Sequence, residues 1–175
     1  PSSAAFFIVA ALITANSDIT IPAVGMNPLR TGLIITLQEM GGKIEISNKR
    51  IVGGEEGANI RVCHSELSDI NVPPERAASM IDEYPILSVA ASVATGQTLM
   101  QGIAELRLKE TDRIRVMAEG LMMAGVSVSY NDDSMTVTGG VVQGGVKISS
   151  LHDHRIAMSF LALGMVAKEP ITVTG

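Results

Sequence analysis

Aromatic residues are scarce in this sequence. Its 175 residues include no Trp, 2 Tyr and 3 Phe, whereas 46% of the residues are hydrophobic and 10 are Met. A chain of this length and hydrophobicity is not disordered and can form one domain with a substantial core. That core must therefore be built mainly from aliphatic side chains.

Cysteine is scarcer still. Cys63 is the only one, so no intramolecular disulfide can form, and a reducing, cytoplasmic setting is favoured. Its neighbour His64 could act as the base for a thiolate nucleophile, but adjacent residues of an extended segment point to opposite faces. We therefore assign Cys63 no catalytic role.

Basic residues are outnumbered by acidic ones. The 13 Lys and Arg against 18 Asp and Glu give a net charge of −5, and no basic stripe could neutralise the phosphates of a nucleic acid. We expect no nucleic-acid partner. A small anionic substrate is compatible with this balance, because a few converging cations can dominate one cleft.

Apolar runs of membrane-spanning length are also missing. The opening run, residues 4–13, follows no basic leader and is too short to cross a bilayer, so it predicts a buried helix and no membrane contact. The sequence starts at Pro1 rather than Met. We expect this helix to have been cut just after its natural start.

Three segments share one plan, in which small or charged residues open an apolar helix, a polar turn follows, and a strand comes next. The predicted helix, turn and strand occupy residues 2–15, 16–18 and 19–21, then 82–93, 96–97 and 98–100, then 153–166, 168–170 and 171–173. Such regular recurrence predicts an internal repeat.

A second kind of helix lies between these segments. Residues 31–40 and 113–124 have helical periodicity, end at glycines and lead into alternating strands. Each strand should turn into a hairpin partner, at Asn48-Lys49 and at residues 131–133. Together the elements predict an α/β protein of repeated βαβαββ units.

The stretch 105–113 carries the densest charge, with three cations and three carboxylates in Glu-Leu-Arg-Leu-Lys-Glu-Thr-Asp-Arg. Its first four residues alternate polar and apolar, which predicts a half-buried strand. Thr111 and Asp112 are good N-caps for the helix that follows, which places Lys109 and Glu110 at a strand-to-helix turn. Cations and a carboxyl group at a helix start suit an anionic substrate and a proton donor.

Three ordered segments resemble one enzyme family. Residues 109–113, Lys-Glu-Thr-Asp-Arg, are similar to the Lys-Glu-Ser/Thr-Asp-Arg signature of the 5-enolpyruvylshikimate-3-phosphate (EPSP) synthases. Residues 80–87, Met-Ile-Asp-Glu-Tyr-Pro-Ile-Leu, and 152–159, His-Asp-His-Arg-Ile-Ala-Met-Ser, resemble two further family segments. Residues 27–32 and 37–41 resemble the bacterial branch called class II.

The resemblance covers essentially the whole chain and implies a fold. It is the inside-out α/β fold of enolpyruvyl transferases, with helices buried between outer sheets and three βαβαββ units in each of two domains. Residues 1–175 would form most of the C-terminal domain. The N-terminal domain, with a lysine, an arginine and serines that bind the shikimate phosphate, has no counterpart here, nor has a late lysine beyond the last repeat.

The resemblance also implies a reaction, in which the enolpyruvyl group of phosphoenolpyruvate moves to the 5-hydroxyl of shikimate 3-phosphate and phosphate is released. Glu110 matches the acid that protonates the methylene carbon and later takes that proton back, a role for which we expect a buried carboxyl group. Asp82 matches the base, or the orienting group, for the 5-hydroxyl. The alternatives are that Glu110 is only a carboxylate at a helix dipole and that Asp82 is only an N-cap.

Four cationic or titratable residues complete the implied site. Arg113 and Arg155 match arginines that bind phosphoenolpyruvate, and a guanidinium fork suits its carboxylate and phosphate. Lys109 matches a lysine on the shikimate phosphate side of the pocket. For His154, proton transfer and a hydrogen bond within the loop are both open.

No cofactor or metal is implied. His152, Asp153 and His154 lie at one turn without distant partners, so they do not predict a metal site. Arg30 and Arg107 are further cations near these turns. The resemblance assigns neither a role, and both are interpreted as structural or as supporting the residues that contact substrate.

The expected partners are therefore phosphoenolpyruvate, shikimate 3-phosphate and the missing N-terminal domain. Alone, the chain should fold but show little or no activity, because positioning and water exclusion need both walls of the site. One alternative function is that of the enolpyruvyl transferase that acts on UDP-N-acetylglucosamine. Another is a non-catalytic fragment or binding module. The positions that tune glyphosate binding in the family lie largely outside this chain.

Overall fold

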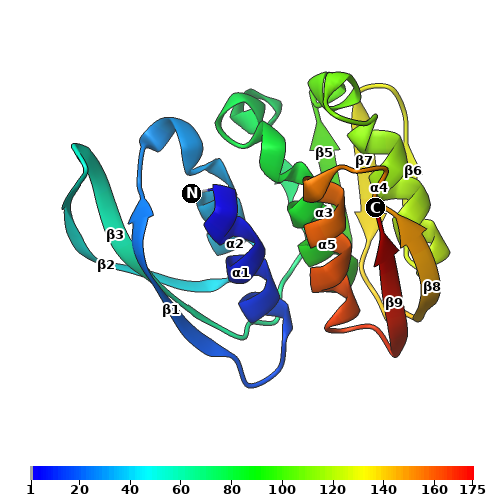
Figure 1. Cartoon of the computed structure of the whole chain (residues 1–175), viewed down its shortest axis with the longest axis horizontal. Coiled ribbons are helices and arrows are strands. Elements are labelled where there is room, and N and C mark those ends of the chain that lie inside the picture. Colours follow the sequence, from blue (N-terminus) through cyan, green and yellow to red (C-terminus); the bar gives the residue numbers. More distant parts are fainter. Residues whose placement is uncertain (1) are drawn as a thin grey trace.

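Three central helices are surrounded by three sheets in the computed structural model, which describes residues 2–175 (Figure 1). The central helices are α1 (Ser2–Ile13), α3 (Tyr84–Val93) and α5 (His154–Gly164), and each packs against the other two. All three are rich in small and aliphatic residues, which allows close helix packing in the interior. None of the helices in the described part of the chain is long and apolar enough to cross a membrane.

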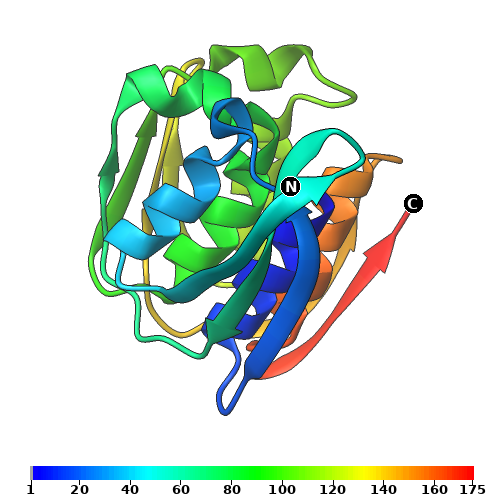
Figure 2. The same ribbon diagram turned by 90° about the vertical axis from the view of Figure 1, so that its left-hand side faces the viewer.

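The first unit contributes a three-stranded antiparallel sheet. It consists of α1, β1 (Asp18–Gly25), α2 (Gly32–Glu39), β2 (Lys43–Val52) and β3 (Glu55–Cys63), with a one-turn 3₁₀ helix η1 (Pro28–Arg30) before α2. The strand order is β1-β3-β2. Figure 2 views the molecule from the side of this sheet, with α2 beside it.

The second unit shows the complete pattern. It runs β4 (Asn71–Val72), α3, β5 (Gln97–Gln101), α4 (Arg113–Met123), β6 (Ser127–Tyr130) and β7 (Ser134–Thr138). Three 3₁₀ helices interrupt it, η2 (Pro74–Ser79) and η3 (Ile81–Glu83) before α3 and η4 (Ala104–Leu108) before α4. The sheet order β4-β5-β7-β6 repeats the first sheet with one strand added, because β4 pairs in parallel with β5.

The third unit contains β8 (Gly144–Ser149), α5 and β9 (Glu169–Thr174), and β8 pairs in parallel with β9 as β4 does with β5. The described chain therefore holds one full βαβαββ unit, one without its opening strand, and the first βαβ of a third. This confirms the predicted repeat and the α/β fold class. Strand β9 begins at Glu169, so the last turn is shorter than predicted.

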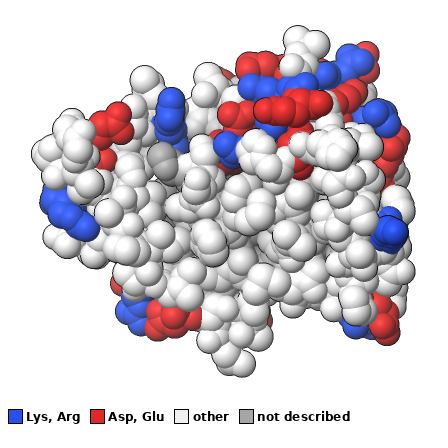
Figure 3. Space-filling view, in the orientation of Figure 1, with Lys and Arg blue, Asp and Glu red and all other residues white. Residues whose placement is uncertain are grey.

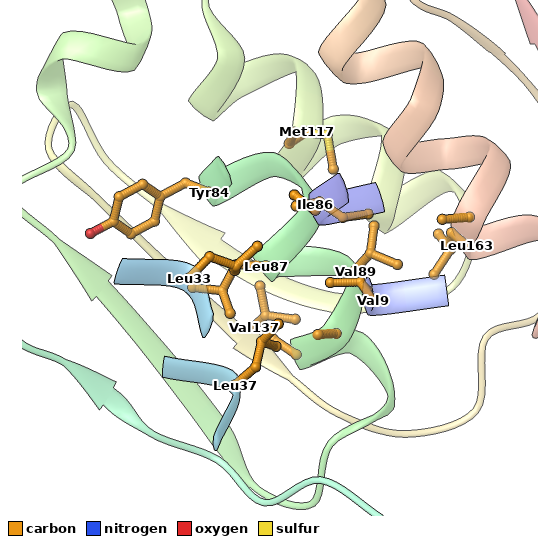
Figure 4. Close-up of a cluster of buried hydrophobic side chains, with 14 of the residues drawn as sticks. Val9, Leu33, Leu37, Tyr84, Ile86, Leu87, Val89, Met117, Val137 and Leu163 are labelled. Carbon is orange, nitrogen blue, oxygen red and sulfur yellow. The ribbon is translucent and has the colours of Figure 1, made fainter. Parts of the chain in front are cut away.

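The core is aliphatic, as the composition predicts. Figure 4 shows part of it, where side chains of α1, α2 and α3 meet those of α4, α5 and β7. Of the residues of α3, only Val93 is not fully buried. Two aromatic side chains, Tyr84 and Phe160, are completely buried in this interior.

Two predicted elements are wrong. Residues 105–108 form the 3₁₀ helix η4 rather than a strand, because Ile103 and Leu106, one turn apart, both enter the core while Leu108 is 84% exposed. The hairpin after β2 turns at Gly53-Gly54 and not at Asn48-Lys49, where the pairing of β2 with β3 shifts register. Asn48 has φ 50°, and a left-handed asparagine suits a bulge as well as a turn. The second predicted hairpin, at residues 131–133 between β6 and β7, is confirmed.

Candidate active site

The candidate site lies where three chain segments meet at the N-terminal ends of α3, α4 and α5. These segments are η3, the turn 109–112 after η4, and the turn before His154. In the orientation of Figure 1 these segments lie at the upper right of the molecule. Figure 3, in the same orientation, shows that charged side chains are densest there. Helix N-termini carry partial positive charge, so this end of the helices favours bound anions.

Two aspartates fix the starts of α4 and α5. The Asp112 carboxylate accepts a hydrogen bond from the backbone N–H of Arg115, and the Asp153 carboxylate accepts hydrogen bonds from those of Arg155 and Ile156. This confirms Asp112 as the predicted N-cap. Asp82 is not a cap, since it lies within η3 and its side chain points to other charged groups.

Arg113 is the centre of the cluster. Its side chain is only 2% exposed, and three carboxylates surround its guanidinium group. Nε lies 2.8 Å from Asp153 Oδ2, Nη1 lies 3.1 Å from Asp82 Oδ1, and Nη2 donates to Glu110. The fork geometry of a guanidinium allows this, and a lysine ammonium could not reproduce it.

Asp153 is fully buried beneath this guanidinium. Burial alone would raise the pKa of Asp153, but hydrogen bonds from Arg113 and Thr111 and the positive charge of Arg113 hold it below its usual value. Thr111 Oγ1 lies 3.0 Å from Asp153 Oδ2. A buried carboxylate is tolerated only when it is paired and hydrogen-bonded in this way.

Lys109 links Asp82 to a residue of η4. Its Nζ lies 3.2 Å from Glu105 Oε1 and 3.4 Å from Asp82 Oδ1. The hydrogen bond with Glu105 is the main reason why the pKa of Lys109 is raised. Lys109 is therefore a protonated cation throughout the neutral range.

Glu110 differs from the sequence-based expectation. Its side chain is 55% exposed, so the burial expected of a proton donor is absent in this chain by itself. The turn 109–112 lies at the protein surface, and within residues 2–175 only Arg113 bonds to the Glu110 carboxylate. Glu110 therefore faces the open side of the cluster.

Arg155 lies beside the cluster, at the start of α5. Its Nη1 is 3.4 Å from the backbone oxygen of Asp82 and 3.7 Å from Glu83 Oε1, and its guanidinium carbon is 5.9 Å from the centre of the Phe6 ring. His154 precedes it and is exposed. The structure thus brings together Asp82, Lys109, Glu110 and Arg113, with Arg155 next to them.

A cavity of about 430 Å³ opens next to these residues. Asp82, Glu83 and Arg155 line one part of it, and Asn27 and Arg30 of the first unit line another. Arg30, which the sequence left as structural or as a supporting residue, thus faces the same space as Asp82. The other cation left as structural, Arg107, is paired with Asp112 and Asp132 at the surface.

Cys63 and His64, the other residues considered for catalysis, lie away from this site. Cys63 ends β3, and His64 lines a separate cavity with Ile13 and Val93, at the C-terminal ends of α1 and α3. Within residues 2–175, no group of His, Cys, Asp and Glu is arranged to hold a metal ion.

Three residues of the cluster were missed as site residues by sequence reasoning. Glu105, Thr111 and Asp153 contribute the contacts to Lys109 and Arg113 described above. Asp153 and Thr111 could have been found only as N-cap candidates, because their pairing joins residues 42 positions apart in the chain. No local pattern encodes such a contact.

Comparison with known proteins decides the family. The model of the EPSP synthase family, 3-phosphoshikimate 1-carboxyvinyltransferase, matches residues 1–175. The chain belongs to the EPSP synthase family. It is 55% identical over 175 residues to the 3-phosphoshikimate 1-carboxyvinyltransferase of Parvibaculum lavamentivorans, an alignment that covers 99% of this chain and 39% of that relative.

Solved structures agree with this membership. An EPSP synthase structure from Acinetobacter baumannii superimposes with a TM-score of 0.95 at 44% identity, over 98% of this chain and 40% of that one. The enolpyruvyl transferase NikO from Streptomyces tendae, at 17% identity and a TM-score of 0.69, covers 99% of this chain and 38% of that one and shares the fold alone. The chain thus spans about 40% of the length of the EPSP synthases it matches.

Proposed function

We propose that this chain forms one wall of an active site that transfers the enolpyruvyl group of phosphoenolpyruvate to the 5-hydroxyl of shikimate 3-phosphate. This step of the shikimate pathway leads to the aromatic amino acids. The observation that carries the proposal is the cluster itself, in which Asp82, Lys109, Glu110 and Arg113 are joined by direct contacts. An acid, a base and anion-binding cations are the groups that this reaction needs.

Each residue has a role in an addition followed by an elimination. Glu110 would give a proton to the methylene carbon while the 5-hydroxyl, losing its proton to Asp82, attacks the neighbouring carbon. Glu110 would then take a proton back from the methyl group as phosphate leaves. Arg113 and Arg155 would bind the anionic groups of phosphoenolpyruvate, and Lys109 the phosphate side of shikimate 3-phosphate.

The excess of negative charge on this wall indicates that the site needs a second wall, rich in cations. The cluster and its edge contain more carboxylates than cations, namely Asp82, Glu83, Glu105, Glu110 and Asp153 against Lys109, Arg113 and Arg155. Two anionic substrates would not be held well by such a surface, because like charges repel at short distance. We propose that further cations come from the part of the enzyme that this chain does not span.

This second wall would also bury Glu110. Covering the exposed side of the turn 109–112 would remove water from the carboxyl group and favour its protonated form. A phosphoenolpyruvate anion bound to Arg113 would at the same time replace Glu110 as a partner of the guanidinium and free it to act as the acid. Both effects make the reaction depend on closure of the site.

The domain, the enzyme class, the cellular location and the role of His154 are also proposals. The chain would be most of the C-terminal domain of a bacterial class II enzyme acting in the cytoplasm, without a cofactor. The class rests on residues 27–32 and 37–41, and the location on the single Cys63. His154, exposed next to Arg155, would help with proton transfer or hold its own loop.

The experiment uses a completed chain, in which this sequence replaces the matching segment of the Parvibaculum lavamentivorans relative. Phosphate release from phosphoenolpyruvate is measured with shikimate 3-phosphate and, separately, with UDP-N-acetylglucosamine. We expect release only with shikimate 3-phosphate. Phosphate release only with UDP-N-acetylglucosamine would favour the alternative transferase activity. No release with either acceptor would overturn the proposal, provided that the completed chain is folded and the parent enzyme is active.

A further inference from the structure

We propose that Asp153, assisted by the hydroxyl group of Thr111, is a positioning residue that fixes Arg113 and the start of α5 relative to each other. The inference rests on the proposed function and adds two residues to it. Asp153 cannot touch a substrate, because its side chain is 0% exposed beneath Arg113. It can act only through the groups that it holds.

Both oxygens of Asp153 are used, and each binds two segments. Oδ2 accepts hydrogen bonds from Arg113 Nε at 2.8 Å and Thr111 Oγ1 at 3.0 Å. Oδ1 lies 3.0 Å from the backbone nitrogen of Arg155 and 3.2 Å from Arg113 Nη2. One carboxylate therefore joins the turn that carries Glu110, the first residue of α4, and the first turn of α5.

This arrangement sets the direction of the Arg113 fork. With Nε and one Nη2 contact fixed by Asp153, the remaining Nη donors point toward Asp82 and Glu110. A planar guanidinium held along one edge can present only its other edge to a ligand. Asp153 thereby decides where an anion bound by Arg113 would lie relative to Arg155.

Thr111 is the part of this arrangement that can be changed with least damage. Its hydroxyl group is partly buried and shares Oδ2 of Asp153 with Arg113. Without it, Arg113 is the only side chain of the described residues that bonds to that oxygen. The guanidinium could then shift along the carboxylate. Thr111 also follows Glu110 directly, so the same change would loosen the turn that carries the proposed acid.

A purely structural role predicts a different result. If Asp153 only capped α5 and neutralised Arg113, weakening it would lower the melting temperature and leave the kinetic constants of the folded enzyme unchanged. A positioning role predicts that kcat and KM for phosphoenolpyruvate change even when they are measured at a temperature at which the variant is fully folded. The two roles are thus separable in one set of variants.

The test compares Thr111→Val and Thr111→Ser in the completed chain, with Thr172→Val, an exposed threonine of β9, as the matched control. For Thr111→Val we expect kcat/KM for phosphoenolpyruvate to fall about ten- to a hundredfold, the size expected for one lost hydrogen bond to a charged group. Thr111→Ser keeps the hydroxyl group and should stay within about twofold of the parent, like Thr172→Val.

Asp153→Asn is the stronger variant and provides the second measurement. It should raise KM for phosphoenolpyruvate more than KM for shikimate 3-phosphate, because Arg113 and Arg155 are the groups it releases. Kinetic constants for Thr111→Val equal to those of the parent would overturn the positioning role, as would equal losses in Thr111→Ser and Thr111→Val. An inactive unsubstituted completed chain would instead overturn the proposed function on which this inference rests.

Discussion

Asp82 and Glu110 contact different nitrogens of the same guanidinium group, that of Arg113. Asp82 Oδ1 lies 3.1 Å from Nη1, and Glu110 binds Nη2. The two carboxylates proposed as base and acid thus share one cation that a substrate anion would also bind. The proposed function therefore predicts an exchange, in which substrate groups replace the protein's own carboxylates on Arg113.

Arg113 should be important for folding as well as for binding. Arg113→Met would leave the buried Asp153 without its cation, and breaking a buried pair in this way costs about 3–5 kcal/mol. Urea unfolding of the chain measures this loss. Arg107→Met removes an arginine with half-exposed, surface pairs and should cost about 1 kcal/mol or less. Equal losses in the two variants would contradict the central place of Arg113.

Asp153 should make the fold sensitive to acid. Its pKa in the folded chain lies below the usual value of about 3.9, so its ionised form stabilises the fold above that pH, and the contribution is lost as pH falls through the folded pKa. The free energy of unfolding of Asp153→Asn should therefore lie below that of the parent at about pH 6, and the difference should narrow as the pH falls below about 4. A difference that stays constant with pH would contradict the assignment.

Gly120 should not tolerate even a methyl group. A Cβ at this position of α4 would lie 2.2 Å from Cζ of the fully buried Phe160 ring, so the ring or the helix would have to shift within the packed core. Gly120→Ala should lose about 1–3 kcal/mol of unfolding free energy despite the better helix propensity of alanine.

Gly164 is the matched control, because it too is a glycine within a helix, α5. A Cβ there would meet only Ile171 at 3.7 Å, an ordinary contact. Gly164→Ala should be neutral or gain up to about 1 kcal/mol. A larger loss for Gly164→Ala than for Gly120→Ala, measured by chemical unfolding, would show that the packing of α4 on α5 is described wrongly.

Tyr84 should weaken the fold in alkali. Burial raises its pKa to about 12, although the charge of Arg76 acts in the opposite direction. A raised folded-state pKa means that its stabilising contribution is complete below the unfolded value of about 10 and is lost as pH rises from there toward the folded value. Its hydroxyl oxygen has no hydrogen-bond partner within residues 2–175.

Tyr84→Phe tests both statements. At neutral pH it should keep or increase the free energy of unfolding, by up to about 1 kcal/mol, because a buried hydroxyl without a partner is removed. Between about pH 9 and pH 11 it should lose less stability than the parent, since one late-titrating group is gone. A clear loss at neutral pH would show that the hydroxyl does have a partner.

Much of the fold follows from local sequence patterns. Helices that end at Gly41 and Gly125, strands that alternate after them, and the repeated order of elements all predict the observed units. The two errors arose where tertiary packing overrides a short pattern. Leu106 is drawn into the core and makes η4 helical, and Asn48 uses its left-handed backbone in a bulge.

The residues of the site could be predicted from the sequence, but the contacts between them could not. The motif resemblance selected Asp82, Lys109, Glu110 and Arg113, which the structure joins. It could not reveal that Arg113 is already occupied by three carboxylates or that Glu110 is exposed. Both facts depend on neighbours from distant parts of the chain and on surfaces that this chain alone leaves open.

The most direct test is phosphate release from phosphoenolpyruvate and shikimate 3-phosphate by three proteins, the 175-residue chain alone, the completed chain, and the completed chain with Glu110→Gln. Far-ultraviolet circular dichroism and thermal melting show whether each is folded. We predict turnover only by the completed chain, with a loss of at least about a hundredfold in Glu110→Gln, as expected for removal of a general acid. Turnover by the chain alone, or an unchanged rate in Glu110→Gln, would contradict the account.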